Sequence, residues 1–318
     1  MKPALKVLKP GLLTTVQDLG RIGFQHTGMV VAGAMDAFSL QVANCLVGNR
    51  RGEAGLEMTV IGPELKALDD IVVALCGADL GPTVDGVPAP LWKSFVLERG
   101  SVLRFRGALS GMRAYLAVAG GICGENVMGS KSTYVRAKIG GIKGRPLRRG
   151  DVLERGEGGA ASRRIGRSLS ADWIPGWNRK EEVRVILGPQ EEAFTPKGIR
   201  TFLGSEYQVT AQSDRMGIRL RGPEIEHRES ADILSDAVSM GAVQVPADGQ
   251  PIVLMADRQT TGGYAKIAAV ISVDLPKLAQ LPPGGHVSFR EVGIEEAQEL
   301  AVRQERFLHK LETAGRSG

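Results

Sequence analysis

The chain has 318 residues, of which 43% are apolar and 24% are charged. This composition excludes a largely disordered chain, and the length favours about two domains. Glycine is unusually common, at 42 residues, and no Gly-X-Y period accompanies it. Because glycine in patterned sequence supplies tight turns between short strands, we predict a strand-rich protein.

The formal net charge is +5, and many of the basic residues fall between Arg136 and Arg167, where no aromatic residue is interleaved. This pattern disfavours nucleic acid as a partner and favours small anions or an acidic protein. The three cysteines are far apart, which indicates reduced thiols. No signal peptide is evident, and the longest apolar run, of about eight residues, is too short to span a membrane. We therefore expect a cytoplasmic protein that binds neither nucleic acid nor membrane.

Strand-like segments account for most of the patterned sequence. Short apolar runs, or runs in which polar and apolar residues alternate, end at glycine or proline, which is typical of strands bounded by turns. The predicted strands, in chain order, span residues 70–77, 101–107, 113–121, 182–187, 250–256, 265–271 and 286–289.

Two segments carry helical signals. Asp36 is a suitable N-cap for a helix over residues 37–47. Apolar residues recur at helical spacing over residues 294–311, and Glu295 and Glu296 suit the positive N-terminal end of that helix. We predict that both helices pack against a sheet or a barrel.

A small, polar and then aromatic stretch separates two strand-rich halves. We predict a first domain over residues 1–160, a linker over 161–180 and a second domain over 181–318 that ends with the C-terminal helix. A glycine turn followed by a strand recurs late in each half, which suggests two related barrels.

Several well-known site motifs are absent from the sequence. It contains no Walker loop, no dinucleotide-binding glycine fingerprint, no zinc-protease helix and no Met-Lys-Met site for biotin attachment. The four histidines lack ligand spacing, so we expect no metal site. We interpret Gly129–Thr133 as a turn that caps, or that binds an anion through backbone N–H groups, rather than as a Ser-Lys catalytic pair.

Polar residues gather between glycines in both halves. In the second half they occur at residues 213–217, 244–251 and 258–264, and in the first half at 14–21 and 33–36. Two interpretations stay open, because such clusters serve either as turn-capping networks or as a binding site at the ends of strands.

Taken in chain order, and extended to residues 213–220 and 257–266, these blocks resemble the family that contains the C subunit of 5-oxoprolinase and allophanate hydrolase subunit 2. This is a biotin-dependent carboxyltransferase family that includes the carboxyltransferase region of urea carboxylase. The resemblance runs from about Leu5 to Phe307. It implies a mainly β fold of tandem cyclophilin-like β-barrels with a few short helices and a C-terminal helix. The other matching blocks are residues 113–121, 129–133 and 140–151.

The resemblance also implies a function in a complex. Such proteins act with a directly bound B-subunit partner and an A-subunit partner to hydrolyse 5-oxoproline to glutamate, with ATP as a cofactor of the complex. One alternative is a carboxyltransferase-like component for another urea or amide substrate, with biotin carried on a separate chain. Another is a non-catalytic regulator that resembles the antagonist of the sporulation kinase inhibitor. Ile218, Met240 and residues 123–126 depart from the family pattern and leave the exact substrate open.

The polar clusters give the candidate site residues. An amide substrate presents a carbonyl and N–H groups that glutamine and threonine side chains can bind, and Arg215 or Lys266 can stabilise a developing oxyanion. We predict Asp214, Arg215 and Lys266 as catalytic residues; Asp214 has the alternative role of a structural partner for Arg215. The predicted substrate-binding residues are Gln244, Gln250, Gln259, Thr260, Thr261 and Tyr264, with a second patch of Gln17, Asp18, Arg21 and Asp36.

Overall fold

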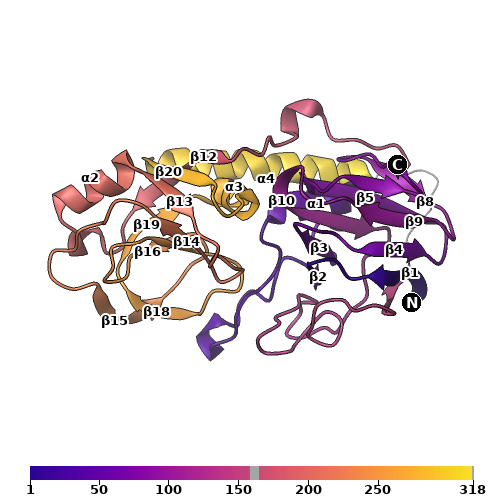
Figure 1. Cartoon of the computed structure of the whole chain (residues 1–318), viewed down its shortest axis with the longest axis horizontal. Coiled ribbons are helices and arrows are strands. Elements are labelled where there is room, and N and C mark those ends of the chain that lie inside the picture. Colours follow the sequence, from indigo (N-terminus) through magenta and orange to yellow (C-terminus); the bar gives the residue numbers. More distant parts are fainter. Residues whose placement is uncertain (158–164, 317–318) are drawn as a thin grey trace. The chain divides into compact units, whose positions relative to one another are not determined.

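Most regular elements are β-strands in the computed structural model, which describes residues 1–157 and 165–316 (Figure 1). The mainly β fold class is thus confirmed. The described α-helices are α1 (Ala37–Leu46), α2 (Pro196–Gly204), α3 (Leu275–Gln280) and α4 (Ile294–Arg316). Short 3-10 turns are η1 (Gln25–Thr27), η3 (Ala171–Trp173), η4 (Glu191–Ala193) and η5 (Ser272–Asp274).

Contacts between residues divide the chain into two units. Unit 1 comprises Met1–Arg21, Ala32–Trp177 and Arg306–Gly318, and unit 2 comprises Ile22–Val31 and Asn178–Glu305. The predicted boundaries instead placed Ile22–Val31 in the first domain and Arg306–Gly318 in the second. Residues 161–164 of the predicted linker lie outside the described residues.

Two antiparallel sheets form unit 1. One has the order β11-β1-β4-β9-β6-β7 and the other the order β2-β3-β10-β5-β8. The strands of the first sheet are β1 (Lys2–Lys9), β4 (Glu64–Ala67), β6 (Pro82–Val84), β7 (Val87–Pro88), β9 (Val102–Phe105) and β11 (Val152–Arg155). Those of the second are β2 (Leu13–Gln17), β3 (Gly55–Thr59), β5 (Ile71–Asp79), β8 (Ser94–Leu97) and β10 (Ser110–Val118).

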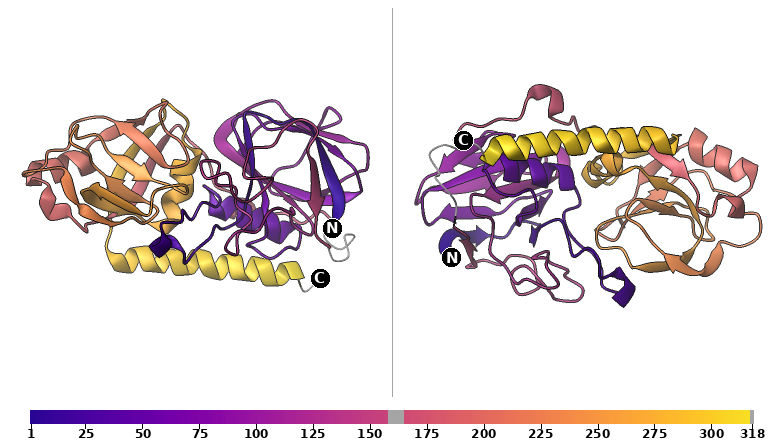
Figure 2. Two further views of the ribbon diagram at one scale, coloured as in Figure 1. Left: turned by 90° about the horizontal axis from the view of Figure 1, so that it is seen from below. Right: turned by 180° about the vertical axis from the view of Figure 1, so that it is seen from behind.

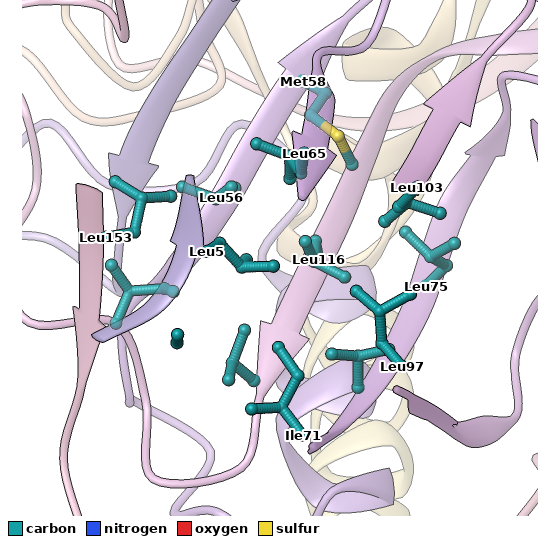
Figure 3. Packing of buried hydrophobic residues seen from close by; sticks show 14 of the residues in the cluster. Leu5, Leu56, Met58, Leu65, Ile71, Leu75, Leu97, Leu103, Leu116 and Leu153 are labelled. Carbon is teal, nitrogen blue, oxygen red and sulfur yellow. The ribbon is translucent and has the colours of Figure 1, made fainter. Parts of the chain in front are cut away.

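Leucine side chains from both sheets meet in the core of unit 1 (Figure 3). Leu5 and Leu65 come from the first sheet, and Leu56, Leu75 and Leu116 from the second, and all five are fully buried. Since burying one leucine side chain contributes roughly 1.5–3 kcal/mol, this cluster is the main source of cohesion between the two sheets.

Helix α1 packs on the side of the second sheet that faces away from this core. The Asp36 carboxylate caps the helix by accepting hydrogen bonds from Ser39 N at 2.9 Å and Ser39 Oγ at 2.6 Å. The predicted helix over residues 37–47 is confirmed, with its end one residue earlier. Phe38 and Leu46 pack against strands β5 and β10.

The C-terminal helix, predicted over residues 294–311, is also confirmed and is one continuous helix of 23 residues (Figure 2). Its Phe307 ring stacks on Trp173, with 3.7 Å between the ring centroids, and its centroid lies 6.3 Å from that of the Phe38 ring. The aromatic part of the stretch between the halves therefore docks within unit 1. None of the described helices combines the length and apolar character needed to cross a bilayer.

Unit 2 contains a closed barrel with the strand order β12-β19-β16-β17-β14-β13-β20, beside which β15 and β18 pair as a two-stranded sheet (Figure 1). The barrel strands are β12 (Lys180–Leu187), β13 (Glu206–Val209), β14 (Gly217–Arg221), β16 (Ala242–Gln244), β17 (Ile252–Leu254), β19 (Lys266–Val270) and β20 (His286–Glu291). The paired strands are β15 (Asp232–Ala237) and β18 (Thr261–Tyr264).

An ion pair fixes β12 to the turn η5 that follows β19. Arg184 donates from Nε and Nη2 to the two oxygens of Asp274, at 2.8 and 2.7 Å, and Arg184 N donates to Asp274 Oδ2 at 2.8 Å. Burial raises the pKa of the Asp274 carboxyl, but the hydrogen bonds and charge of Arg184 and the charge of Lys277 outweigh burial, so the net shift is downward.

In unit 1, the turn at Gly129–Thr133 binds the Asp18 carboxylate of the same chain, through two hydroxyls and one backbone N–H. Ser130 Oγ and Ser132 Oγ donate to Asp18 Oδ1 at 2.7 and 2.5 Å, and Lys131 N donates to Oδ2 at 2.6 Å. Gly20 N donates to Oδ1 at 2.8 Å. One buried carboxylate thus joins this turn to the end of β2.

Replacing Asp18 with alanine should destabilise unit 1 by at least about 2 kcal/mol, because the buried donors that it binds would lose their acceptor. Chemical denaturation measures the loss, and hydrogen exchange should show it first in residues 127–144. The control is Asp69→Ala, since Asp69 is an exposed carboxylate paired with Arg155. That change should cost at most about 1 kcal/mol. Equal losses in the two variants would contradict the role of Asp18.

Unit 2 should lose stability in acid through Asp274. Its pKa in the folded state lies below the unfolded value of 3.8, so the ion pair stabilises the fold above about pH 4. This contribution disappears as the pH falls through the folded-state pKa. Thermal unfolding from about pH 6 to about pH 3 should therefore show a smaller pH dependence in Asp274→Asn than in the unaltered protein. Identical slopes would sink this assignment.

Candidate functional site

A cavity of about 390 Å³ in unit 2 contains the predicted residue Lys266. Lys266 begins β19, Thr260 precedes β18, Asp236 comes from β15 and Arg258 follows β17. We call this cavity the Lys266 pocket. Its lining residues are Gln25, Pro189, Asp236, Ala237, Val238, Ser239, Ala242, Arg258, Thr260, Lys266, Ala268 and Ala269.

The ammonium group of Lys266 is held in place by a carboxylate. Lys266 is 3% exposed, and its Nζ donates to Asp236 Oδ2 at 3.2 Å. The backbone N–H of Ala237, followed by the charged hydrogen bond from Lys266, lowers the pKa of the Asp236 carboxyl. Asp236 is therefore ionised at neutral pH, and its carboxylate offsets part of the cost of burying the Lys266 side chain.

Arg258 adds a second cation to the Lys266 pocket. Its Nε donates to the carbonyl of Val238 and its Nη1 to that of Met255, both at 3.2 Å. Burial lowers its pKa, yet a guanidinium stays protonated in proteins. Because neutral carbonyls hold Arg258, its charge is not cancelled. Two cations and one carboxylate give the pocket a net charge of +1, which suits a ligand with a negative group.

Arg215, a predicted catalytic residue, forms a buried ion pair with Asp257. Its Nε and Nη2 donate to the Asp257 carboxylate at 3.0 and 2.8 Å, and Asp257 N donates to the Arg215 carbonyl at 2.8 Å. Asp214 accepts hydrogen bonds from Met216 N and Gly217 N within its own turn. The pair thus fixes Asp257, the residue directly before Arg258, to the turn that precedes β14.

Gln244 is buried and forms a hydrogen bond with the end of β18. It is 2% exposed, and its Nε2 donates to the Tyr264 carbonyl at 3.2 Å. A Cβ on Gly262 would lie 2.6 Å from the same Nε2, so glycine at this position lets the strand approach Gln244 without displacing its amide. Gln244 therefore positions the segment between Thr260 and Lys266.

The other predicted residues of the second half do not all converge on Lys266. Gln250 pairs with Gly222, accepting from its N–H at 2.8 Å and donating to its carbonyl at 3.2 Å. Gln250 and Tyr264 line a different cavity. Gln259 is half-buried and Thr261 is exposed. One sequence cluster is thus divided between two cavities.

The predicted patch in the first half lies in unit 1 and is largely buried. Arg21 is 1% exposed, and its Nη2 donates to the Ser132 carbonyl at 2.5 Å. Gln17 Nε2 donates to Thr15 Oγ1 at 3.0 Å and to the Thr133 carbonyl at 3.1 Å. The turn at Gly129–Thr133 therefore brings Gln17, Asp18 and Arg21 together.

Asp36 belongs to a different network in unit 1. Its backbone N–H donates to the Tyr115 hydroxyl at 2.8 Å, and that hydroxyl donates to Glu57 Oε2 at 2.7 Å. Burial, followed by the nearby carboxylates, raises the pKa of Tyr115, which keeps the hydroxyl protonated and able to donate.

Sequence reasoning missed several lining residues of the Lys266 pocket. Arg258 lay inside a polar cluster but was not selected, and its position next to the chosen Gln259 was the available signal. No sequence pattern pointed to Asp236, Ser239 or Gln25 as lining residues. Gln25 belongs to unit 2 although it lies far from the other lining residues in the sequence. Within residues 1–157 and 165–316, no three His, Cys, Asp or Glu side chains are grouped as metal ligands.

Known proteins with similar sequences are subunits or segments of enzymes. The chain is 38% identical over 307 residues to the C subunit of 5-oxoprolinase from Escherichia coli K12, covering 96% of this chain and 97% of that one. It is 37% identical over 298 residues to the protein of the same name from Haemophilus influenzae, covering 93% and 94%. Urea amidolyase of Saccharomyces cerevisiae is 31% identical over 95% of this chain and 17% of its own length.

Solved structures of a urea amidolyase and a urea carboxylase are also similar to this chain. Urea amidolyase of Kluyveromyces lactis superposes with a TM-score of 0.92 at 29% identity, covering 98% of this chain. The chain spans only 20% of that enzyme and 30% of the urea carboxylase of the same yeast, which also gives a TM-score of 0.92. The family described as carboxyltransferase domain, subdomain A and B, matches residues 27–291. Because this match covers most of the sequence, the chain belongs to the carboxyltransferase domain, subdomain A and B, family.

Proposed function

We propose that the chain is the C subunit of an ATP-dependent 5-oxoprolinase, which converts 5-oxoproline, ATP and water to glutamate, ADP and phosphate. The observation that carries this proposal is the 38% identity to the C subunit of a 5-oxoprolinase over almost the full length of both chains. The proposed partners are a directly bound B-subunit homologue and an A-subunit homologue, and the proposed location is the cytoplasm.

The Lys266 pocket suits the proposed substrate in size and charge. A volume of about 390 Å³ lies toward the small end of ligand sites, which run from about 300 to 1,000 Å³. The ring of 5-oxoproline carries a carboxylate and a cyclic amide. We assign the carboxylate to Arg258, whose guanidinium can bind it through two parallel hydrogen bonds. The hydroxyls of Ser239 and Thr260 are available for the polar edge of the ring.

Lys266 is the proposed electrophilic residue. When the amide carbonyl is attacked, negative charge develops on its oxygen, and a fixed ammonium group in a partly dry site stabilises that charge. Asp236 orients Lys266 through the hydrogen bond that Nζ donates to Oδ2. Arg215 acts through Asp257 on the position of Arg258, so we propose it as a positioning residue.

The described helix N-termini of unit 1 and the start of α4 do not fit the phosphates of ATP. A helix N-terminus attracts phosphate through free N–H groups, but the Asp36 carboxylate occupies that of α1. Glu295 and Glu296 place negative charge in the first turn of α4. No step of the reaction is therefore assigned to ATP at these positions.

A second function is favoured by the TM-score of 0.92 to a urea carboxylase structure. In that case the chain would be a carboxyltransferase-like component acting on a urea or another amide, with biotin carried on a separate chain. The Lys266 pocket would stabilise negative charge on the carbonyl oxygen in either reaction. An assay of the reconstituted complex with 5-oxoproline and with urea, each with and without avidin, separates the two functions. Inhibition by avidin would favour the biotin-dependent reaction.

The purified chain should show negligible 5-oxoproline-dependent ATP hydrolysis by itself. Addition of the B-subunit and A-subunit homologues should produce the activity, because the sequence carries no recognisable nucleotide-binding motif. Release of ADP and glutamate is measured for each combination of the three proteins. Full activity of the isolated chain would overturn the proposed division of labour.

In the reconstituted complex, Lys266→Met should lower kcat by about tenfold to a thousandfold, as expected when a group that stabilises an oxyanion is removed. Arg258→Gln should instead raise KM at least about tenfold, since it removes a contact made equally in the ground state. Lys197→Met is the control, because Lys197 is an exposed lysine of unit 2. Normal kinetics in a folded, partner-bound Lys266→Met protein would refute the assigned role.

A further inference from the structure

A second cavity in unit 2 lies over the outer face of the barrel strand β14. Its volume is about 690 Å³, and it shares no lining residue with the Lys266 pocket. We call it the Arg219 groove. Its lining residues are Thr210, Ala211, Gln212, Arg219, Leu220, Arg221, Pro246, Asp248, Gln250, Ile252 and Tyr264.

Two guanidinium groups lie on the same side of this groove. Arg219 and Arg221 are alternate residues of β14 and are exposed, whereas Ile218 and Leu220 are each 2% exposed and point into the barrel. Because side chains alternate along a strand, both arginines project from the outer face. Their separation along the strand is about 7 Å, so one ligand can contact both.

Neither arginine is neutralised within the part of the chain that the structure describes. No ion pair joins Arg219 or Arg221 to a described carboxylate. Asp248 lies in the same groove, where its Oδ1 accepts a hydrogen bond from Gln250 N at 3.1 Å. Two cations and one carboxylate leave a formal charge of +1, which favours an anion.

Other groups in the groove can bind the rest of a ligand. Tyr264 is 41% exposed and can offer its aromatic ring, and Gln212 is an exposed residue with an amide side chain.

We propose that the Arg219 groove binds a small phosphate monoester, with the phosphate held between Arg219 and Arg221. A planar carboxylate can be satisfied by one guanidinium, whereas a doubly charged tetrahedral phosphate has oxygens for two. The remainder of the ligand lies toward Tyr264 and Gln212. This site is separate from the Lys266 pocket, and its occupancy does not depend on the proposed 5-oxoprolinase activity.

Calorimetric titration of the full chain with AMP at low salt tests the site. Saturable binding is expected, and the double variant Arg219→Gln/Arg221→Gln should weaken it at least about tenfold, because it removes both charged contacts to the phosphate. Two controls should leave binding unchanged. Arg200→Gln alters an exposed arginine of α2, and Lys266→Met alters the other cavity.

Three results would overturn the proposal. The first is an absence of saturable AMP binding to the folded chain. The second is equal weakening by Arg200→Gln, which would indicate non-specific attraction, or by Lys266→Met, which would locate the ligand in the other cavity. The third is glutamate binding as tightly as AMP, which would indicate a carboxylate ligand. None of these results bears on turnover in the reconstituted complex, so the two proposals can fail separately.

Discussion

A charge that is removed from water must find a partner, and unit 2 meets this constraint in two different ways. Arg215 is buried against the buried carboxylate of Asp257, and the buried Lys266 pairs with Asp236, whose side chain is exposed to water. Arg258 is buried just as deeply, yet the groups that accept its hydrogen bonds are neutral carbonyls. The positive charge of Arg258 is therefore held in a fixed direction and remains available to an incoming anion.

The same constraint organises unit 1, where the roles are reversed. A buried carboxylate, Asp18, is surrounded by hydroxyl and backbone donors from one turn. This arrangement orders the turn without using a cation, and it leaves the Arg21 guanidinium to bind the carbonyls of Ser132 and Val127. Both units thus use hydrogen bonds to main-chain groups to keep charged side chains inside a β-framework.

Elements with a strong local signal could be predicted from the sequence. The Asp36 cap indicated α1, apolar spacing indicated α4, and the apolar run at residues 70–77 indicated β5. Helix α2 was missed although Thr195 caps it and Pro196 begins it, because its nine residues hold too short an apolar stripe to stand out. The pairing of strands into a closed barrel depends on contacts between distant residues. The repeated glycine turn and strand suggested barrels, and the family resemblance implied them.

The sequence indicated individual candidate residues for the site but not their arrangement. Lys266 and Thr260 line one cavity, whereas Tyr264, only two residues from Lys266, lines the other. Which cavity each residue lines depends on where the pairing of β18 with β15 ends and where the barrel strand β19 begins. Asp236 could not be found, because its pairing with Lys266 joins residues that are 30 positions apart.

Each unit contains a segment from the other half of the chain, so neither half, expressed by itself, would contain a complete unit. A polypeptide that stopped before residue 178 would lack Phe307 and Leu308, which bury part of its own surface beside Phe38 and Trp173. A polypeptide that began there would lack Gln25, which lines its own cavity. Splitting the gene at the apparent boundary would therefore yield two incomplete proteins, each of which depends on a segment that the other gene now encodes.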